Sequence, residues 1–163
     1  MVAISGSSDL SDGPCIWPRL QMGTTEGSRM EKSVQRTILI VDDDLFIRTG
    51  LGDVLTRYGY SVITAKDGIE AFKVLTQGNP DIIIIDKVMP NFDGFEFCKL
   101  LRGLRKFHPI PIILISGQMT PEDEEEAMHM GFFDYLQKPI DETTLVRRVR
   151  WALGFYDRLR SIL

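Results

Sequence analysis

Three runs of four consecutive apolar residues constrain the fold of this 163-residue chain more than any other feature. They lie at residues 38–41, 82–85 and 112–115 and contain only isoleucine, leucine and valine. Each run is too short for a buried helix and is rich in β-branched side chains, which favours a strand. Because the apolar residues are continuous rather than alternating, both faces of each strand are predicted to be covered, as in a parallel sheet between helices.

Two weaker segments complete the predicted sheet. Residues 61–64 alternate polar with apolar side chains, and residues 132–136 are interrupted by an aspartate, as expected at the margins of a sheet. Helical patterns fill the gaps between strands, around residues 47–58, 67–75 and 95–104, from the Thr120-Pro121 start and from Asp141. Asp44 immediately precedes the first of these helices and is assigned to its N-terminal cap.

Strands and helices therefore alternate along the chain with short connections. This order predicts a three-layer, doubly wound α/β fold of the flavodoxin-like (βα)5 type, with right-handed crossovers. With the three apolar runs central and the two weaker segments at the margins, the parallel five-stranded sheet is expected in the order 2-1-3-4-5.

Composition excludes several classes of protein. The net charge of −4 gives a field of the wrong sign for general binding to nucleic acid or anionic membranes. No apolar stretch approaches the roughly 20 residues of a transmembrane helix, and the start lacks the pattern of a signal peptide, so a cytoplasmic protein is expected. Cys15 and Cys98 form neither a disulfide framework nor a metal-binding spacing.

The ends of the chain differ from its centre. Residues 1–36 are dominated by Ser, Gly, Thr and Pro and are predicted to be a disordered tail or an added extension, with Met30 as an alternative start and residues 15–20 as an alternative docking motif. Residues 37–154 form the predicted domain, and residues 155–163 extend its last helix. A heptad seam runs along that helix through Leu145, Val149, Ala152, Tyr156, Leu159 and Leu163. Its second half, with no sheet left to cover, is expected to pair with another chain, continue into an output domain, or fray.

Polar groups end four of the five predicted strands. Asp42 and Asp43 follow the first, Asp86 the third, Ser116 the fourth and Lys138 the fifth. Because the carboxyl ends of parallel strands meet at one edge of the sheet, these groups are expected in one crevice. Oxygen ligands suit Mg²⁺, a strand-end carboxylate can act as a nucleophile toward a phosphoryl group, and the lysine and serine can contact phosphoryl oxygens.

Each of these groups has an ordinary explanation when taken alone. A pair of aspartates after a strand often caps a helix, a serine there is usually a turn residue, and a Lys-Pro pair is usually a loop. Without a cation, neighbouring carboxylates repel each other by about 4 kcal/mol per pair at 4 Å and an effective dielectric near 20. Their joint arrival at one edge therefore favours a magnesium and phosphoryl site.

At these positions the sequence resembles the receiver domains of two-component response regulators, over residues 37–153. The likeness comprises ILIVDDD at 38–44, DKVMP at 86–90 followed by Asp-Gly at 93–94, ISG at 115–117 and DYLQKP at 134–139. The resemblance implies that Asp86 is phosphorylated by a sensor histidine kinase or a histidine phosphotransfer protein. The domain would then be a signalling module that catalyses only its own phosphorylation and dephosphorylation.

The same resemblance implies a role for each residue of the crevice. Asp43 and Asp86 would bind Mg²⁺ together with the main-chain carbonyl of Val88, and Asp42 would act mainly through water. The resemblance also assigns Lys138 and Ser116 to the phosphoryl oxygens and a cis peptide bond to Lys138-Pro139. Ser116 and Tyr135 would move on phosphorylation and change the surface of the fourth helix, fifth strand and fifth helix, although Tyr135 could simply pack at the sheet margin.

Two other functions are known for α/β folds of this kind. A haloacid-dehalogenase-type aspartyl-phosphate hydrolase also uses Asp, Ser or Thr, Lys and Mg²⁺, but its nucleophile follows the first strand, whereas Asp86 follows the third. A flavodoxin-like cofactor binder needs a phosphate-cradling loop after the first strand, where residues 42–44 are three aspartates.

Charge also hints at a homodimer. Residues 122–126 make the fourth helix acidic, whereas Arg147, Arg148 and Arg150 make the fifth basic. The two helices are expected either to complement each other across a dimer or to be ordinary solvated faces.

Overall fold

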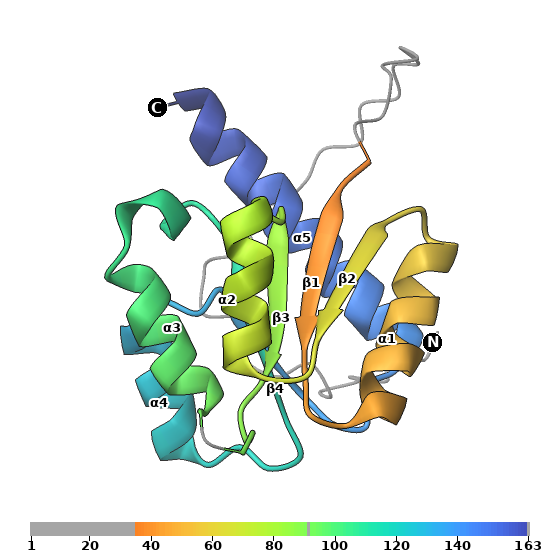
Figure 1. The fold of residues 1–163 in the computed structure, drawn as a ribbon, viewed down its shortest axis with the longest axis vertical. Helices are drawn as coiled ribbons and strands as arrows, with labels where there is room; N and C mark the ends of the chain where they lie inside the picture. The colour runs from red at the N-terminus through yellow and green to blue at the C-terminus, as the bar shows by residue number, and fades with distance from the viewer. Residues whose placement is uncertain (1–34, 91, 163) are drawn as a thin grey trace, which may run out of the picture.

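The computed structural model describes residues 35–90 and 92–162, in which five parallel strands lie in the order β2-β1-β3-β4-β5. The strands are β1 (Thr37–Val41), β2 (Ser61–Ala65), β3 (Ile82–Asp86), β4 (Ile112–Ser116) and β5 (Asp134–Gln137). The helices are α1 (Leu45–Arg57), α2 (Gly68–Gln77), α3 (Gly94–Arg102), the short 3-10 helix η1 (Arg105–Phe107), α4 (Pro121–Met130) and α5 (Glu142–Ile162). The predicted fold class and strand order are confirmed, and because all the strand pairings are parallel, the strands end at the same edge of the sheet, as the arrows of β1 and β3 show in Figure 1.

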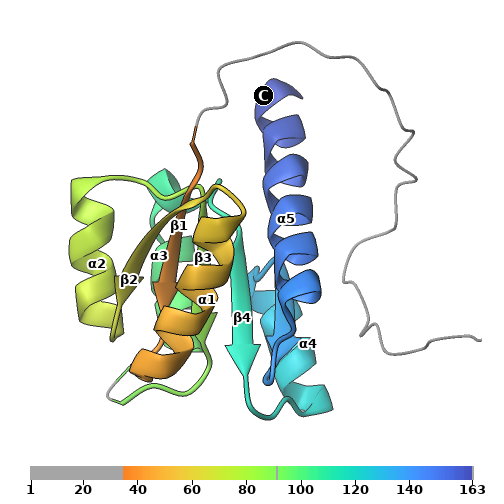
Figure 2. The same ribbon diagram turned by 90° about the vertical axis from the view of Figure 1, so that its right-hand side faces the viewer.

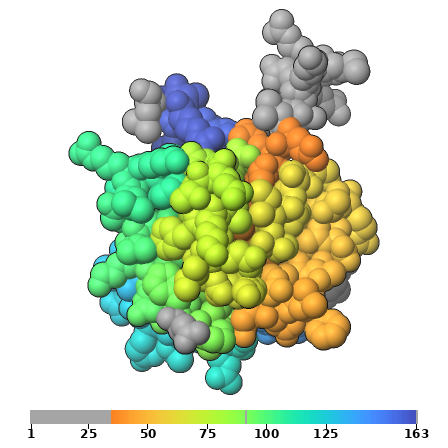
Figure 3. Space-filling model, viewed as in Figure 1, coloured from red at the N-terminus to blue at the C-terminus, as the bar shows by residue number. Residues whose placement is uncertain are grey.

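The continuous apolar runs are buried on both faces, as predicted. In β1, Leu39 and Val41 pack with the core beneath α2, α3 and α4. Ile38 and Ile40 point to the other face and pack against α1 and α5. Figure 2 shows these layers from the side, and in Figure 3 the helices leave little of the sheet visible.

Several predicted helix starts are confirmed by capping contacts. The Asp44 side chain accepts hydrogen bonds from the amides of Phe46 and Ile47 at the start of α1. Asp67 caps α2, and Thr120 begins α4 in a reciprocal capping box with Asp123. These local signals are short in range, which is why they can be recognised in the sequence alone.

The third helix ends earlier than predicted. It stops at Arg102, and Leu104 lies beyond it with 46% of its side chain exposed. The arginine explains the break, because its guanidinium gathers main-chain carbonyls from the following loop and from the end of α4. These carbonyls belong to Phe107, His108, Ile110 and Gly131.

The fifth strand begins and ends later than the predicted residues 132–136, since β5 covers Asp134–Gln137. Phe132 and Phe133 lie just before it and are buried on opposite faces of the sheet.

The last helix continues through Gly154 to Ile162. Its residues Leu145, Val149 and Ala152 lie in the core, as the heptad seam predicted. The predicted extension from Phe155 onward still contacts the domain in its first turn, because the rings of Phe155 and Tyr156 lie 5.5 and 5.8 Å from that of Phe133. Leu159 and Ile162 beyond them are exposed, and the end of α5 projects past the sheet (Figure 1).

The start of the described chain is tied to this helix. The Arg36 guanidinium forms ion pairs with Asp81 at 2.8 Å and with Asp157 of α5 at 2.7 Å. The predicted tail at residues 1–36, with Met30 and the motif at 15–20, falls almost entirely on residues 1–34, outside the described part, as does Leu163. Within the described ranges, none of the helices is long and apolar enough to cross a membrane.

Candidate functional site

The predicted carboxylates do converge at the carboxyl edge of the sheet. Asp42 directly follows β1 and Asp86 is the last residue of β3, the neighbouring strand. Asp42, Asp43 and Asp86 each place one carboxylate oxygen within 4.8 Å of the others. The oxygens of Asp43 and Asp86 are therefore close enough to share one cation, as the predicted metal site requires.

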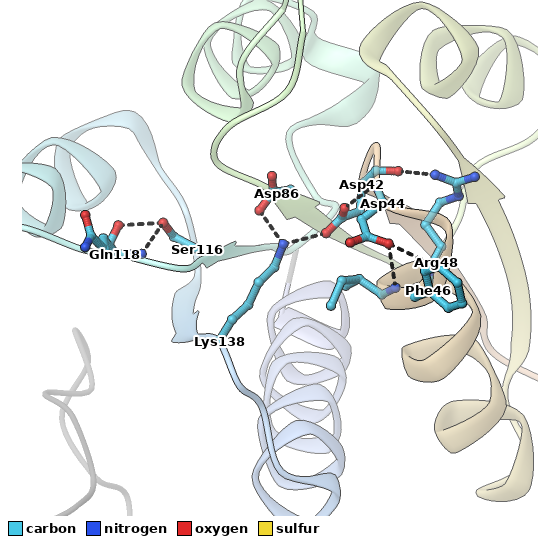
Figure 4. A network of polar contacts seen from close by, with 9 residues as sticks. Asp42, Asp44, Phe46, Arg48, Asp86, Ser116, Gln118 and Lys138 are labelled. Atoms are coloured by element: carbon cyan, nitrogen blue, oxygen red, sulfur yellow. Dashed lines mark hydrogen bonds and ion pairs between the residues drawn. The ribbon is translucent and has the colours of Figure 1, made fainter.

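Lys138 enters the same cluster from the loop after β5. Its Nζ lies 2.8 Å from Asp42 Oδ2 and 2.8 Å from Asp86 Oδ1 (Figure 4). Burial raises the pKa of Asp86, and the hydrogen bond from Lys138 opposes this shift. Burial also works against the charged form of Lys138, but its bonds to Asp42 and Asp86 outweigh that effect and raise the pKa of the ammonium.

The cluster carries an excess of negative charge that a divalent cation would balance. Three carboxylates face one ammonium, and Asp42 and Asp86 are buried, so water screens their repulsion poorly. Asp43 is exposed, which leaves one side of the cluster open to solvent. An all-oxygen donor set with access to water fits the preference of Mg²⁺ for carboxylates and retained waters.

Main-chain contacts fix the loop that carries the first two aspartates. Asp42 Oδ1 accepts the amide of Asp44 at 2.8 Å, and the Asp42 carbonyl accepts a bond of 2.6 Å from the Arg48 guanidinium. The Asp42 amide donates to the carbonyl of Ala65, the last residue of β2. The buried carboxylate is thus held in one orientation, and Arg48 is a supporting residue that the sequence alone did not indicate.

Gly94 packs closely against the end of β3 from the other side. Its amide donates to the Lys87 carbonyl at 3.0 Å, and a Cβ at this position would lie 2.6 Å from the main-chain oxygen of Asp86. Real Cβ atoms do not approach backbone oxygen so closely, so β3 or α3 must shift if a side chain is added.

We therefore expect Gly94→Ala to destabilise the fold by about 1–3 kcal/mol, as overpacking does. Mg²⁺ affinity should also fall, because Asp86 moves away from Asp42 and Asp43. Urea unfolding and calorimetric titration with Mg²⁺ measure the two effects. Gly50→Ala is the matched control, since nothing lies within 4 Å of its Cβ position in α1. Equal stability and Mg²⁺ affinity for Gly94→Ala and the wild-type protein would contradict the prediction.

Ser116 lies at the end of β4, but its hydroxyl does not face Asp86. Its Oγ donates to the Gln118 carbonyl at 2.5 Å and accepts the Gln118 amide at 3.2 Å, to one side of the Lys138 contacts (Figure 4). The Lys138 amide donates to the Ser116 carbonyl at 2.7 Å, so the two residues are linked through the backbone. A phosphoryl contact from this hydroxyl remains a prediction that needs rotation of the side chain.

The remaining predicted residues surround this cluster. The Lys138-Pro139 peptide bond is cis, as the resemblance implied. Val88 has an exposed side chain, and its role through the main-chain carbonyl stays a prediction. Burial raises the pKa of Tyr135 to about 12, and the neighbouring carboxylate of Glu124 in α4 adds to this shift. Tyr135 is partly buried against the core beside α4, which fits packing as well as switching.

Two charged contacts were missed from the sequence. Lys87, directly after Asp86, forms an ion pair with Asp123 in the first turn of α4. Arg148 is buried and lies 3.1 Å from the buried Asp134 of β5. The assignment of Arg148 to an exposed basic face of the fifth helix is therefore wrong, because its guanidinium turns inward to a carboxylate that a charge run cannot reveal.

Comparison with known proteins agrees with this geometry. The response regulator receiver domain family matches residues 38–150, which contain all four strand-end groups. The chain belongs to this family. A receiver domain is a phosphoacceptor signalling module of two-component systems, and the acidic cluster of Asp42, Asp43 and Asp86 is consistent with the metal site of such domains. Family membership decides against the dehalogenase-type and flavodoxin-like alternatives.

Individual relatives cover the same part of the chain. The transcriptional regulatory protein AfsQ1 of Streptomyces coelicolor is 37% identical over 122 residues, 75% of this chain and 53% of that protein. The response regulator MprA of Mycobacterium tuberculosis is 36% identical over 116 residues, 71% of this chain and 50% of MprA. The chain thus spans about half the length of these curated relatives.

Solved structures of similar proteins share the fold. The chemotaxis protein CheY4 of Vibrio cholerae aligns with a TM-score of 0.70 and 33% identity, over 73% of this chain and 99% of CheY4. A putative response regulator from Chloroflexus aurantiacus also gives a TM-score of 0.70, with 34% identity over 74% of this chain and 98% of its own. The receiver domain of this chain therefore matches those structures over nearly their whole length.

Proposed function

We propose that Asp86 of this receiver domain accepts a phosphoryl group from a sensor histidine kinase or a histidine phosphotransfer protein, in a reaction that requires Mg²⁺. The observation that carries the proposal is the setting of Asp86, a nearly buried carboxylate 2.8 Å from Lys138 and within 4.8 Å of the oxygens of Asp42 and Asp43. A positioned carboxylate can attack phosphorus and form an acyl phosphate. Catalysis then consists mainly of positioning and charge neutralisation.

The three aspartates, with the main-chain carbonyl of Val88, are the proposed ligands of Mg²⁺. When bound, the ion supplies the positive charge that lets the carboxylates and the phosphoryl oxygens come together. Asp42 is fully buried and already accepts bonds from Lys138 and the Asp44 amide, so it would act mainly through a water. Asp43, which is exposed, and Asp86 would contact the ion directly.

Lys138 and Ser116 are the proposed contacts of the phosphoryl oxygens. The Lys138 ammonium already touches Asp86 and needs only a small movement to reach a group attached to it. The Ser116 hydroxyl must first break its hydrogen bond to the Gln118 carbonyl, and that change would move the loop before α4. Tyr135, partly buried beside α4, would respond to the same movement and alter the α4-β5-α5 surface.

The rim of the crevice supports a protein as the phosphoryl donor. Leu45 and Phe46 at the start of α1 are 63% and 86% exposed, and Val88 in the loop after β3 is 69% exposed. Exposed apolar side chains beside a functional site are typical of protein docking surfaces. Since Asp86 is only 5% exposed, the donor histidine must project from a surface that covers this rim.

A homodimer receives no added support. With Arg148 buried against Asp134, only Arg147 and Arg150 of the three arginines remain exposed on α5. Acidic α4 and this reduced basic face fit ordinary solvated helices equally well.

Acetyl phosphate with Mg²⁺ tests the proposal by intact-mass measurement. The wild-type protein should gain about 80 Da, the mass of one phosphoryl group, and chelation of Mg²⁺ by EDTA should abolish the gain. Asp86→Asn should gain nothing, whereas Asp53→Asn, an exposed aspartate on α1, should behave like the wild type. An equal adduct on Asp86→Asn would refute the assignment of the phosphoacceptor.

A further inference from the structure

The fourth helix buries little apolar surface against the rest of the domain. Of its ten residues only Ala127 is buried. The neighbouring α3 buries five of its nine residues, including Phe95, Phe97 and Leu101. Apolar burial is the main source of helix stability in a domain. The position of α4 therefore depends more than that of α3 on its side-chain bonds.

One of these bonds reaches the residue next to the phosphoacceptor. Lys87 Nζ lies 2.5 Å from Asp123 Oδ2, and both side chains are mostly shielded from solvent, with 22% and 16% exposed. The Lys87 amide donates to the Ile115 carbonyl of β4 at 2.8 Å, so its backbone is fixed to the sheet. The ammonium also lies 6.0 Å from the centre of the Phe95 ring of α3. Lys87 thus spans from the end of β3 to the start of α4.

At the other end, the contact is made with the cap of α4. Asp123 Oδ2 accepts the amide of Thr120 at 2.9 Å, and the Asp123 amide donates to Thr120 Oγ1 at 3.2 Å. The carboxylate that pairs with Lys87 is therefore part of the structure that begins the helix. A displacement of Lys87 would therefore act on the first turn of α4, because Asp123 is fixed in the helix cap.

We propose that Lys87 and Asp123 form an ionic brace that sets the position and opening rate of the first turn of α4. Lys87 is covalently joined to Asp86, so a shift of the loop after β3 on phosphorylation is passed to α4 through this brace. This second step rests on the proposed function, whereas the brace itself does not.

Hydrogen exchange of the unphosphorylated protein tests the brace directly. Amides of residues 124–128 should exchange roughly three- to tenfold faster in Lys87→Met and in Asp123→Asn, the range for a partly shielded ion pair. Asn at position 123 still offers an oxygen to the Thr120 amide, so the cap is retained. The double variant should exchange no faster than either single variant, because both remove the same bond.

Glu122→Gln is the matched control. It removes the same charge from the same turn, but Glu122 is exposed and outside the brace. Its exchange should equal that of the wild type, and so should its unfolding midpoint in urea. Exchange in Lys87→Met no faster than in Glu122→Gln would overturn the brace.

The coupling step is tested after treatment with acetyl phosphate and Mg²⁺. All variants should be phosphorylated to the same extent by intact mass, but the change in α4 exchange on phosphorylation should be smaller in Lys87→Met and Asp123→Asn than in the wild type. An unchanged α4 response in these variants would overturn the coupling. If the wild type is not phosphorylated at all, the proposed function fails, and the exchange of the untreated proteins still decides whether the brace exists.

Discussion

Lys138→Ala is expected to slow phosphorylation of Asp86 by acetyl phosphate about 100-fold, the usual scale for removing one charge that stabilises a transition state. The Lys138 ammonium is 2.8 Å from Asp86 and is the only cation bonded to that carboxylate among the described residues. Mg²⁺ affinity should stay equal or rise, because the lysine no longer competes for Asp42 and Asp86. The rate is measured by intact mass over time and the affinity by calorimetric titration.

Lys99→Ala is the control for this experiment. Lys99 is exposed on α3 and has no contact with the acidic cluster, so its removal should change neither quantity.

The change in hydrogen exchange of α4 and β5 on phosphorylation should also be lost in Lys138→Ala, even when phosphorylation is driven to completion. A Lys138→Ala protein that is phosphorylated at the wild-type rate would show that the lysine has only a structural role.

Arg148→Met is expected to lower the free energy of unfolding by about 3–5 kcal/mol, the usual cost of removing one partner of a buried ion pair. Asp134 is 2% exposed, and burial raises its pKa while Arg148 opposes the shift. Without the arginine, an isolated carboxylate stays buried between β5 and α5. The loss is measured by urea unfolding, with Arg158→Met in the projecting turn of α5 as an exposed control.

Acid should reduce this loss. An aspartate whose pKa is raised by folding destabilises the folded state only where the unfolded chain is ionised, which is above the ordinary aspartate pKa of 3.8. The difference between Arg148→Met and the wild type should therefore be smaller near pH 4 than at pH 7. A double variant, Arg148→Met with Asp134→Leu, should recover most of the stability, since an apolar pair can replace a buried ion pair. No recovery would mean that the arginine acts through packing alone.

Much of this domain could be recognised from short stretches of sequence. The runs at 38–41, 82–85 and 112–115 predicted the three central strands, because four continuous β-branched or aliphatic residues fit only a strand covered on both faces. Asp44 and Thr120 marked helix starts, because capping acts over three or four residues. The expected convergence of Asp42, Asp43 and Asp86 followed from the rule that parallel strands end at one edge.

Contacts between distant segments were decided only by the tertiary structure. Lys138 reaches Asp42 across 96 positions of sequence, and its simultaneous contact with Asp86 depends on how the loop after β5 folds over the edge. Arg148 resembles its exposed neighbours in sequence, yet packing turns it inward to Asp134. The direction of the Ser116 hydroxyl likewise follows from the loop that contains Gln118.

The sequence by itself determined the layers of this receiver domain, its strand order and the gathering of its acidic residues, because these depend on periodicity and on the ends of strands. The tertiary structure decided which charges are buried, which are paired and which helix depends on polar anchors, as with Lys87 and Asp123. The physical reason is that a charged side chain finds its partner through packing and register between elements, and no local pattern encodes that geometry.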